Sequence, residues 1–186
     1  GPGEKKLEID RRRIRERISQ LKRELSEIRQ HRELIREKRK KKNVKIAALV
    51  GYSSAGKSSI LNLLTEADVL VDAKLFSTLD TTTRALKLPG GQTVYLTDTV
   101  GFIRKLPHHL IEAFKSTLEE VTYADIIVHV VDASHPQMEV KMQTVYDTLR
   151  QLGVEDQPVI TLFNKMDKLP DAGRMRDFRA DETIRT

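Results

Sequence analysis

The feature that most limits the fold is a glycine-rich segment, G-Y-S-S-A-G-K-S at residues 51–58, which directly follows the apolar run Val44–Val50. The apolar run predicts a buried strand, and the stretch Ser58–Leu64 predicts a helix. Glycines between a strand and a helix let backbone N–H groups converge on phosphate oxygens at the helix N-terminus. The segment therefore predicts a phosphate-binding loop in an α/β protein.

Each position of this loop has an expected role. The Lys57 ammonium would reach the terminal phosphates and assist catalysis, and the Ser58 hydroxyl would bind Mg²⁺. The residues expected to contact a nucleotide here are Gly51, Ser53, Ser54, Ala55, Gly56, Lys57, Ser58 and Ser59.

A second motif, N-K-M-D at Asn164–Asp167, follows the apolar run Val159–Phe163. The Asp167 carboxylate would accept two hydrogen bonds from the N1–H and N2–H₂ edge of guanine. Adenine has no such pair of donors, and an unsatisfied carboxylate would cost ~1–3 kcal/mol or more. With Asn164 and Lys165 beside it, Asp167 predicts GTP or GDP as the ligand and argues against an ATPase.

Between these motifs lies D-T-V-G at residues 98–101, after the short apolar strand Val94–Thr97. Asp98 would hold a Mg²⁺-bound water, and the Gly101 N–H would meet the γ-phosphate, because glycine permits close approach of the backbone. The order of the three motifs is the one that a GTP-binding protein requires.

A run of threonines, residues 81–83, precedes Arg84. One of them would close on Mg²⁺ and the γ-phosphate when GTP is present, with Thr83 the first candidate and Thr82 the second. The alternative is that the threonines merely lead into a strand at Ala85–Leu88.

Longer stretches of the chain resemble the HflX family of ribosome-associated translational GTPases. They are K-L-F-S-T-L-D-T-T-T-R, L-T-D-T-V-G-F-I-R-K-L-P-H-H-L-I-E-A-F-K-S-T-L-E-E, H-V-V-D-A-S-H-P and the start G-P-G-E-K-K-L-E-I-D-R-R-R. The resemblance runs from Gly1 to about Pro170. It implies a GTPase that acts on the large ribosomal subunit and its RNA, and that splits or rescues stalled or idle ribosomes.

The phosphate loop departs from the family at three positions. The family usually has Thr-Asn where this chain has Ser53-Ser54, and Thr where it has Ser59. In related GTPases that asparagine helps to place an activating K⁺, so Ser54 argues against activation by K⁺ here.

Composition limits the remaining possibilities. The chain has 186 residues, a net charge of +6 and no cysteine, so it has no disulfide framework and no cysteine–histidine zinc site. It has no apolar run of ~18 residues, which excludes a membrane-spanning helix. We expect a cytoplasmic monomer.

Residues 1–42 predict one long basic helix as a separate unit. They carry 17 Lys and Arg against 8 Asp and Glu, a net charge of +9, whereas the remainder carries −3. Leu7, Ile14, Leu21, Ile28 and Ile35 recur every seven residues, which favours one half of a helical hairpin. The charge predicts contact with RNA, and the alternative is a solvated helix with i,i+4 ion pairs.

Residues 43–186 predict a Ras-like P-loop GTPase unit, with a mostly parallel sheet and helices on both faces. P-G-G-Q at residues 89–92 predicts a hairpin, and therefore one antiparallel strand. Further expected elements are a helix at Leu110–Glu120, a strand at Ile126–Val131 and a helix at Val140–Leu152. After Asp167 a GTPase of this type needs another helix, a strand that ends in a Ser-Ala-type base-contacting loop, and a final helix. Residues 170–186 contain no such motif, so the unit is expected to lack its C-terminal strand and helix.

The residue after Gly101 bears on catalysis. In Ras-like enzymes it is often a glutamine that orients the attacking water, but here it is Phe102, which cannot hydrogen-bond to water. We therefore expect slow hydrolysis of GTP without an activator. The alternative is an RNA-binding or scaffolding module whose nucleotide site senses nucleotide without significant turnover.

Overall fold

The computed structural model describes residues 1–52, 54–65, 83–99, 118–169 and 175–186. The chain divides into two compact units, residues 1–43 and 44–186, one residue beyond the boundary expected from the sequence. Gly101, Phe102, Thr82, Ser53 and most of the helix expected at 110–120 lie outside the described residues.

The first unit is the helix α1, Pro2–Lys41. It contains no glycine or proline after Gly3, and it has Glu4 in the first turn and four basic residues in the last turn, where the helix dipole favours each charge. The apolar residues of its heptad seam are largely exposed, as Leu7, Ile14, Ile18, Leu21 and Leu25 show. In the described parts of the chain, no helix has the length and apolar character needed to cross a membrane.

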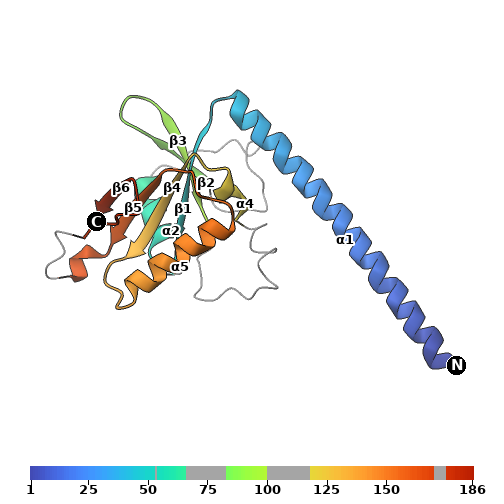
Figure 1. Ribbon diagram of the computed structural model, residues 1–186. Coiled ribbons are helices and arrows are strands. Elements are labelled where there is room, and N and C mark those ends of the chain that lie inside the picture. The colour runs from blue at the N-terminus through green and yellow to red at the C-terminus, as the bar shows by residue number, and fades with distance from the viewer. Residues whose placement is uncertain (53, 66–82, 100–117, 170–174) are drawn as a thin grey trace. The chain divides into compact units, whose positions relative to one another are not determined.

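The second unit is built on a six-stranded sheet in the order β2-β3-β1-β4-β5-β6 (Figure 1). Strand β2 runs antiparallel to β3, and the other neighbouring strands are parallel. This arrangement confirms the expected α/β class and the hairpin before β3. The strands are β1 Lys45–Gly51, β2 Thr83–Lys87, β3 Thr93–Asp98, β4 Ile126–Asp132, β5 Val159–Asn164 and β6 Glu182–Arg185.

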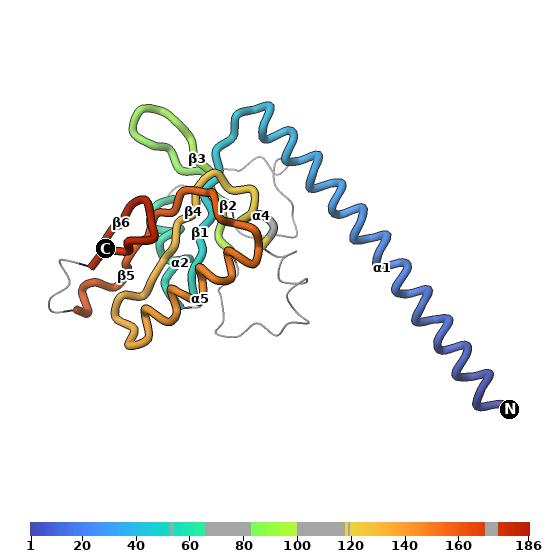
Figure 2. Tube along the Cα trace, viewed as in Figure 1, coloured from blue at the N-terminus to red at the C-terminus, as the bar shows by residue number. Residues whose placement is uncertain are grey.

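Helices cover both faces of this sheet (Figure 2). Alternate residues of the central strand β1 enter two different cores: Ile46, Ala48 and Val50 pack with Val145 and Leu149 of α5. Ala47 and Leu49 pack on the other face with Ile60 and Leu61 of α2. A strand buried on both faces must be apolar throughout, which explains the unbroken run of apolar residues before the glycine-rich loop. The helices are α2 Lys57–Leu64, α4 Glu119–Thr122, α5 Met138–Gln151 and the short 3₁₀ helix η3 Met166–Lys168.

The end of the chain differs from the expectation. Residues 182–185 form β6, which pairs in parallel with β5, so a strand does follow Asp167 where the unit was expected to lack its C-terminal strand. The strand is short, lies at the edge of the sheet, and has exposed residues at both ends. It therefore lacks the apolar run by which the buried strands are recognised.

The parallel order has one consequence for function. Strands β1, β3, β4 and β5 all end at the same edge of the sheet, and open α/β sheets bind ligands in the crevice at that edge. The glycine-rich loop, Asp98 and Asn164 all lie at or directly after these ends.

Candidate nucleotide-binding site

The glycine-rich loop needs glycine at two positions for different reasons. Gly56 caps α2 with φ 100°, a conformation that L side chains rarely adopt, and a Cβ atom there would collide with Nδ2 of Asn164. At Gly51 a Cβ atom would collide with the carbonyl oxygen of Val130 in β4. The loop is thus fitted closely against the ends of two other strands.

Lys57 begins α2, and its side chain is folded back over the loop. The residue is 8% exposed, and its Nζ lies 3.5 Å from the carbonyl oxygens of both Gly51 and Tyr52. Burial lowers the pKa of Lys57, and the negative charge of Asp98 opposes this effect. Both contacts are at the long limit for a hydrogen bond, so the ammonium can exchange them for phosphate oxygens.

Ser58 and Asp98 meet although they lie far apart in the sequence. The Ser58 hydroxyl donates to Asp98 Oδ2 at 3.1 Å. The other carboxylate oxygen of Asp98, Oδ1, is buried, and it has no hydrogen-bond partner among the described residues. A hydroxyl and a carboxylate oxygen are the hard donors that Mg²⁺ takes beside waters and phosphate, so this pair fits the predicted metal role.

The N-K-M-D segment is fastened to the glycine-rich loop. Asn164 Nδ2 donates to the carbonyl oxygen of Ala55 at 3.0 Å, and Lys165 Nζ donates to that of Ser54 at 3.0 Å. Lys165 itself has φ 63°, which turns the chain sharply after β5. Asp167 follows in η3 and is exposed, so its carboxylate is open to a ligand.

One further residue of the site was not predicted. Asp132, at the end of β4, accepts a hydrogen bond from Lys165 Nζ at 2.7 Å and others from the backbone and hydroxyl of Ser134. Burial acts to raise the pKa of Asp132, but the hydrogen bonds from Lys165 and Ser134 outweigh it and lower the pKa. The sequence feature that could have identified Asp132 as a site residue was its position directly after the apolar run of a buried strand.

The structure does not bring every predicted residue to the same point. Thr83 is the first residue of β2, and its hydroxyl lies 3.2 Å from that of Thr97 on β3, so its switch role stays a prediction. Ser59 lies exposed in the first turn of α2. Ser53, Thr82 and Gly101 fall outside the described residues, and their roles stay predictions as well.

Sequence comparisons identify relatives of both units. The family described as "50S ribosome-binding GTPase" matches residues 46–165, and the family described as "GTP-binding GTPase Middle Region" matches residues 1–39. A protein of Lacrimispora saccharolytica named GTPase HflX is 60% identical over 185 residues, which are 100% of this chain and 44% of that protein. The Escherichia coli protein of the same name is 43% identical over 92% of this chain and 40% of its own length. These matches confirm the resemblance seen in the sequence.

A solved structure shares the fold. The crystal structure of a GTP-binding protein from Sulfolobus solfataricus in complex with GDP superposes with a TM-score of 0.59 and 26% identity, over 82% of this chain and 50% of that one. The chain described here spans less than half the length of the two curated relatives.

Proposed function

Because the chain belongs to the family of 50S ribosome-binding GTPases, we propose that it binds GTP with Mg²⁺ and hydrolyses it to GDP and phosphate. We further propose that it acts with the large ribosomal subunit in the cytoplasm, in the splitting or rescue of ribosomes. The observation that carries the proposal is the pair of hydrogen bonds from Asn164 and Lys165 to the carbonyl oxygens of Ala55 and Ser54. They hold the N-K-M-D segment, which would read the base, and the glycine-rich loop, which would bind phosphate, at one edge of the sheet.

The proposed nucleotide contacts follow from this arrangement. Backbone N–H groups of the glycine-rich loop would bind the phosphates at the N-terminus of α2. The Lys57 ammonium would neutralise charge that develops on the transferred phosphoryl group. Asp167 would select guanine, since its carboxylate matches only guanine's pair of donors.

Mg²⁺, when bound, would neutralise phosphate charge and help to hold the nucleotide. Ser58 would supply its hydroxyl oxygen, and Asp98 would orient the surrounding waters through the carboxylate that already accepts from Ser58. With Phe102 in place of a water-positioning side chain, hydrolysis by the protein alone would be slow, about 10⁻⁴ s⁻¹ as for unassisted small GTPases. The ribosome would supply the activation.

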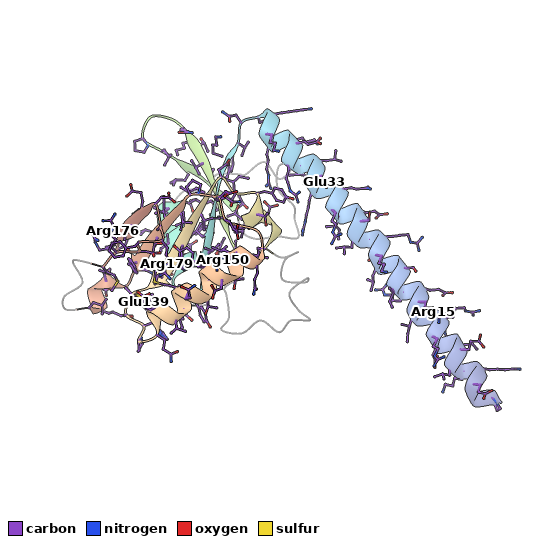
Figure 3. The ribbon with its side chains drawn as sticks, in the orientation of Figure 1. Arg15, Glu33, Glu139, Arg150, Arg176 and Arg179 are labelled. Carbon is purple, nitrogen blue, oxygen red and sulfur yellow. The ribbon has the colours of Figure 1, made fainter. Side chains whose placement is uncertain are left out.

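The basic helix supports an RNA partner. Residues 1–42 carry a net charge of +9, and within the described residues 1–31 the side-chain ion pairs are those of the N-terminus with Glu4 and of Arg12 with Glu16. Most cationic side chains in this stretch therefore face solvent, as around Arg15 in Figure 3. Their binding to RNA phosphates would release counterions, so affinity would fall steeply between about 50 and about 200 mM salt.

The test is steady-state release of phosphate from GTP, with the chain and its Lys57→Ala variant each titrated with large ribosomal subunits. We expect turnover that rises with added subunits and that is lost in the variant. A chain that binds GTP and subunits but whose turnover does not rise would instead support the second candidate, an RNA-binding module that only senses nucleotide. That candidate is favoured by the charge of α1, which needs no hydrolysis to act.

A further inference from the structure

An exposed aromatic side chain stands at the corner of a tight turn before β6. Phe178 is 87% exposed, the highest value among the large apolar side chains of the described residues. The turn is closed by the Ala180 N–H, which donates to the carbonyl oxygen of Asp177 at 3.3 Å. Because the ring buries almost no surface within the chain, it contributes little to the stability of the fold.

The turn that presents this ring is firmly anchored. Asp177 is buried, and its Oδ2 accepts hydrogen bonds from the hydroxyls of Tyr146 and Thr161, each at 2.7 Å. Its Oδ1 accepts from the backbone N–H and the Nε of Arg179, at 3.1 and 2.9 Å. A carboxylate with four hydrogen bonds fixes the turn to α5 and β5, so the ring is held in its exposed position.

Arg179 strengthens the anchor on the side of α5, where Figure 3 shows it near Glu139. Its guanidinium lies 4.7 Å from the centroid of the Tyr146 ring, donates to Gln143 and pairs with Glu139 at 3.6 Å. The positive charge of Arg179 is therefore engaged in contacts within the fold.

One guanidinium group lies beside the ring, and a second arginine lies close to it in the fold. The Arg176 guanidinium lies 5.4 Å from the centroid of the Phe178 ring. The exposed Arg185 donates a hydrogen bond to the carbonyl oxygen of Met175, the residue before Arg176, at 2.8 Å. The nearby carboxylates of Asp177 and Asp181 are taken up by hydrogen bonds within the fold. Among residues 175–186, Glu182 is the acidic residue whose carboxylate makes no such hydrogen bond. Its single negative charge faces the two positive charges of the surface residues Arg176 and Arg185, so this surface is net positive.

We propose that Phe178 and Arg176 form a stacking platform for an unpaired base of RNA. Bases splayed out of RNA loops are bound by stacking on aromatic rings and on guanidinium planes. Both groups are present here, Phe178 on the fixed turn and Arg176 directly before it. The proposal rests on the proposed function for the identity of the RNA as ribosomal. It adds a contact on the GTPase unit that differs in chemistry from the electrostatic contact of α1.

The chain contains no tryptophan, so a Phe178→Trp variant carries a single indole at the proposed contact. The matched control is Leu63→Trp, at a side chain 71% exposed on α2. The probe is a single-stranded RNA of about 12 nucleotides. We expect quenching of the indole emission at position 178 and none at position 63. In the Phe178→Ala variant we expect affinity for this RNA to fall about 5- to 150-fold, the change that ~1–3 kcal/mol of stacking represents.

The salt dependence of the affinity distinguishes the stacking contribution of Phe178 from the electrostatic contribution of α1. The loss on Phe178→Ala should persist when salt is raised from about 50 to about 200 mM, whereas the contribution of α1 falls over that range. Phe178→Tyr should keep the affinity, which excludes a general effect of changing the turn. The quenching needs neither GTP nor subunits, so its failure is distinct from failure of the GTPase proposal.

Three results would overturn the platform. The first is absence of quenching at position 178, or equal quenching at position 63. The second is weaker binding of large subunits by Phe178→Ala without quenching by RNA, which would indicate a protein contact. The third is a blue-shifted, unquenched emission at position 178 in the presence of RNA, which would indicate that protein covers the ring.

Discussion

Asp132 is expected to control nucleotide affinity without contacting nucleotide, because it holds Lys165. The two groups are 2.7 Å apart, and their side chains are 20% and 28% exposed. A hydrogen bond to a charged group contributes ~1.5–3 kcal/mol, and partial exposure reduces this through solvent screening. We therefore expect Asp132→Asn to weaken binding of GDP and GTP by about 1–2 kcal/mol, which is about 5- to 30-fold.

The pH dependence of this effect follows from the lowered pKa of Asp132. A carboxyl whose pKa is lowered in the folded state is fully ionised at any pH above its ordinary value of about 3.9, so its hydrogen bond to Lys165 is then fully present. This bond is lost as the pH falls through the lowered pKa. The difference in affinity between the two proteins should therefore be constant from about pH 5 to pH 8. Isothermal titration with GDP at several pH values measures it.

A double-mutant cycle with Lys165→Met isolates the pair. If Asp132 acts through Lys165, its substitution should have little further effect once Lys165 is gone. Asp147→Asn is the control, because Asp147 pairs with Arg150 at 3.9 Å on the exposed surface of α5, and it should leave affinity unchanged. Unaltered GDP affinity in Asp132→Asn, with unaltered melting temperature, would refute the reasoning.

Four other predictions concern single positions. Gly56→Ala should destabilise the chain and reduce GDP affinity more than Gly90→Ala, because both glycines have φ near 100° but only the Cβ at position 56 would meet another residue; equal losses in thermal melts would contradict this. Asp177→Asn should lower the free energy of unfolding by about 2–3 kcal/mol at neutral pH. Hydrogen bonds from Tyr146, Thr161 and Arg179 outweigh burial and lower the pKa of Asp177. The difference in stability between the two proteins should therefore be lost only below about pH 4 in denaturant titrations. Asp167→Asn should shift preference from guanosine to xanthosine nucleotides in competition binding, and equal affinity of the unmodified chain for ATP and GTP would refute the base assignment. Ser54→Asn should create or increase stimulation of phosphate release by KCl over NaCl, and strong stimulation of the unmodified chain would show that Ser54 does not disable the site.

The motifs of the site could be predicted because each is local. The phosphate loop follows a strand that is apolar from Ile46 to Val50, and this pattern identifies both the strand and its burial on two faces. Ser58 and Asp98 were each expected to take part in binding Mg²⁺, because each stands at a fixed position in its own motif. The structure places their side chains 3.1 Å apart.

Contacts between distant segments could not be predicted in this way. The need for glycine at position 56 comes partly from Asn164, which lies far along the chain. Asp177 reads as a surface residue in a charged stretch, and only the packing of β5 against α5 brings the hydroxyls of Thr161 and Tyr146 to its carboxylate. Strand β6 is held by its pairing with β5 rather than by an apolar pattern of its own.

The hydrogen bonds between the glycine-rich loop and the N-K-M-D segment give Ser54 two separate roles. Its backbone connects the two segments, and its side chain would face the ligand. Lys165 and Asn164 bind the backbone carbonyl oxygens of Ser54 and Ala55, not their side chains. A change of side chain at Ser54 would therefore alter what the loop presents to phosphate or to a monovalent cation, while the connection to the N-K-M-D segment stays intact. It follows that Ser54→Asn should change the response to K⁺ with little change in GDP affinity, whereas Asp132→Asn should change GDP affinity with little change in that response.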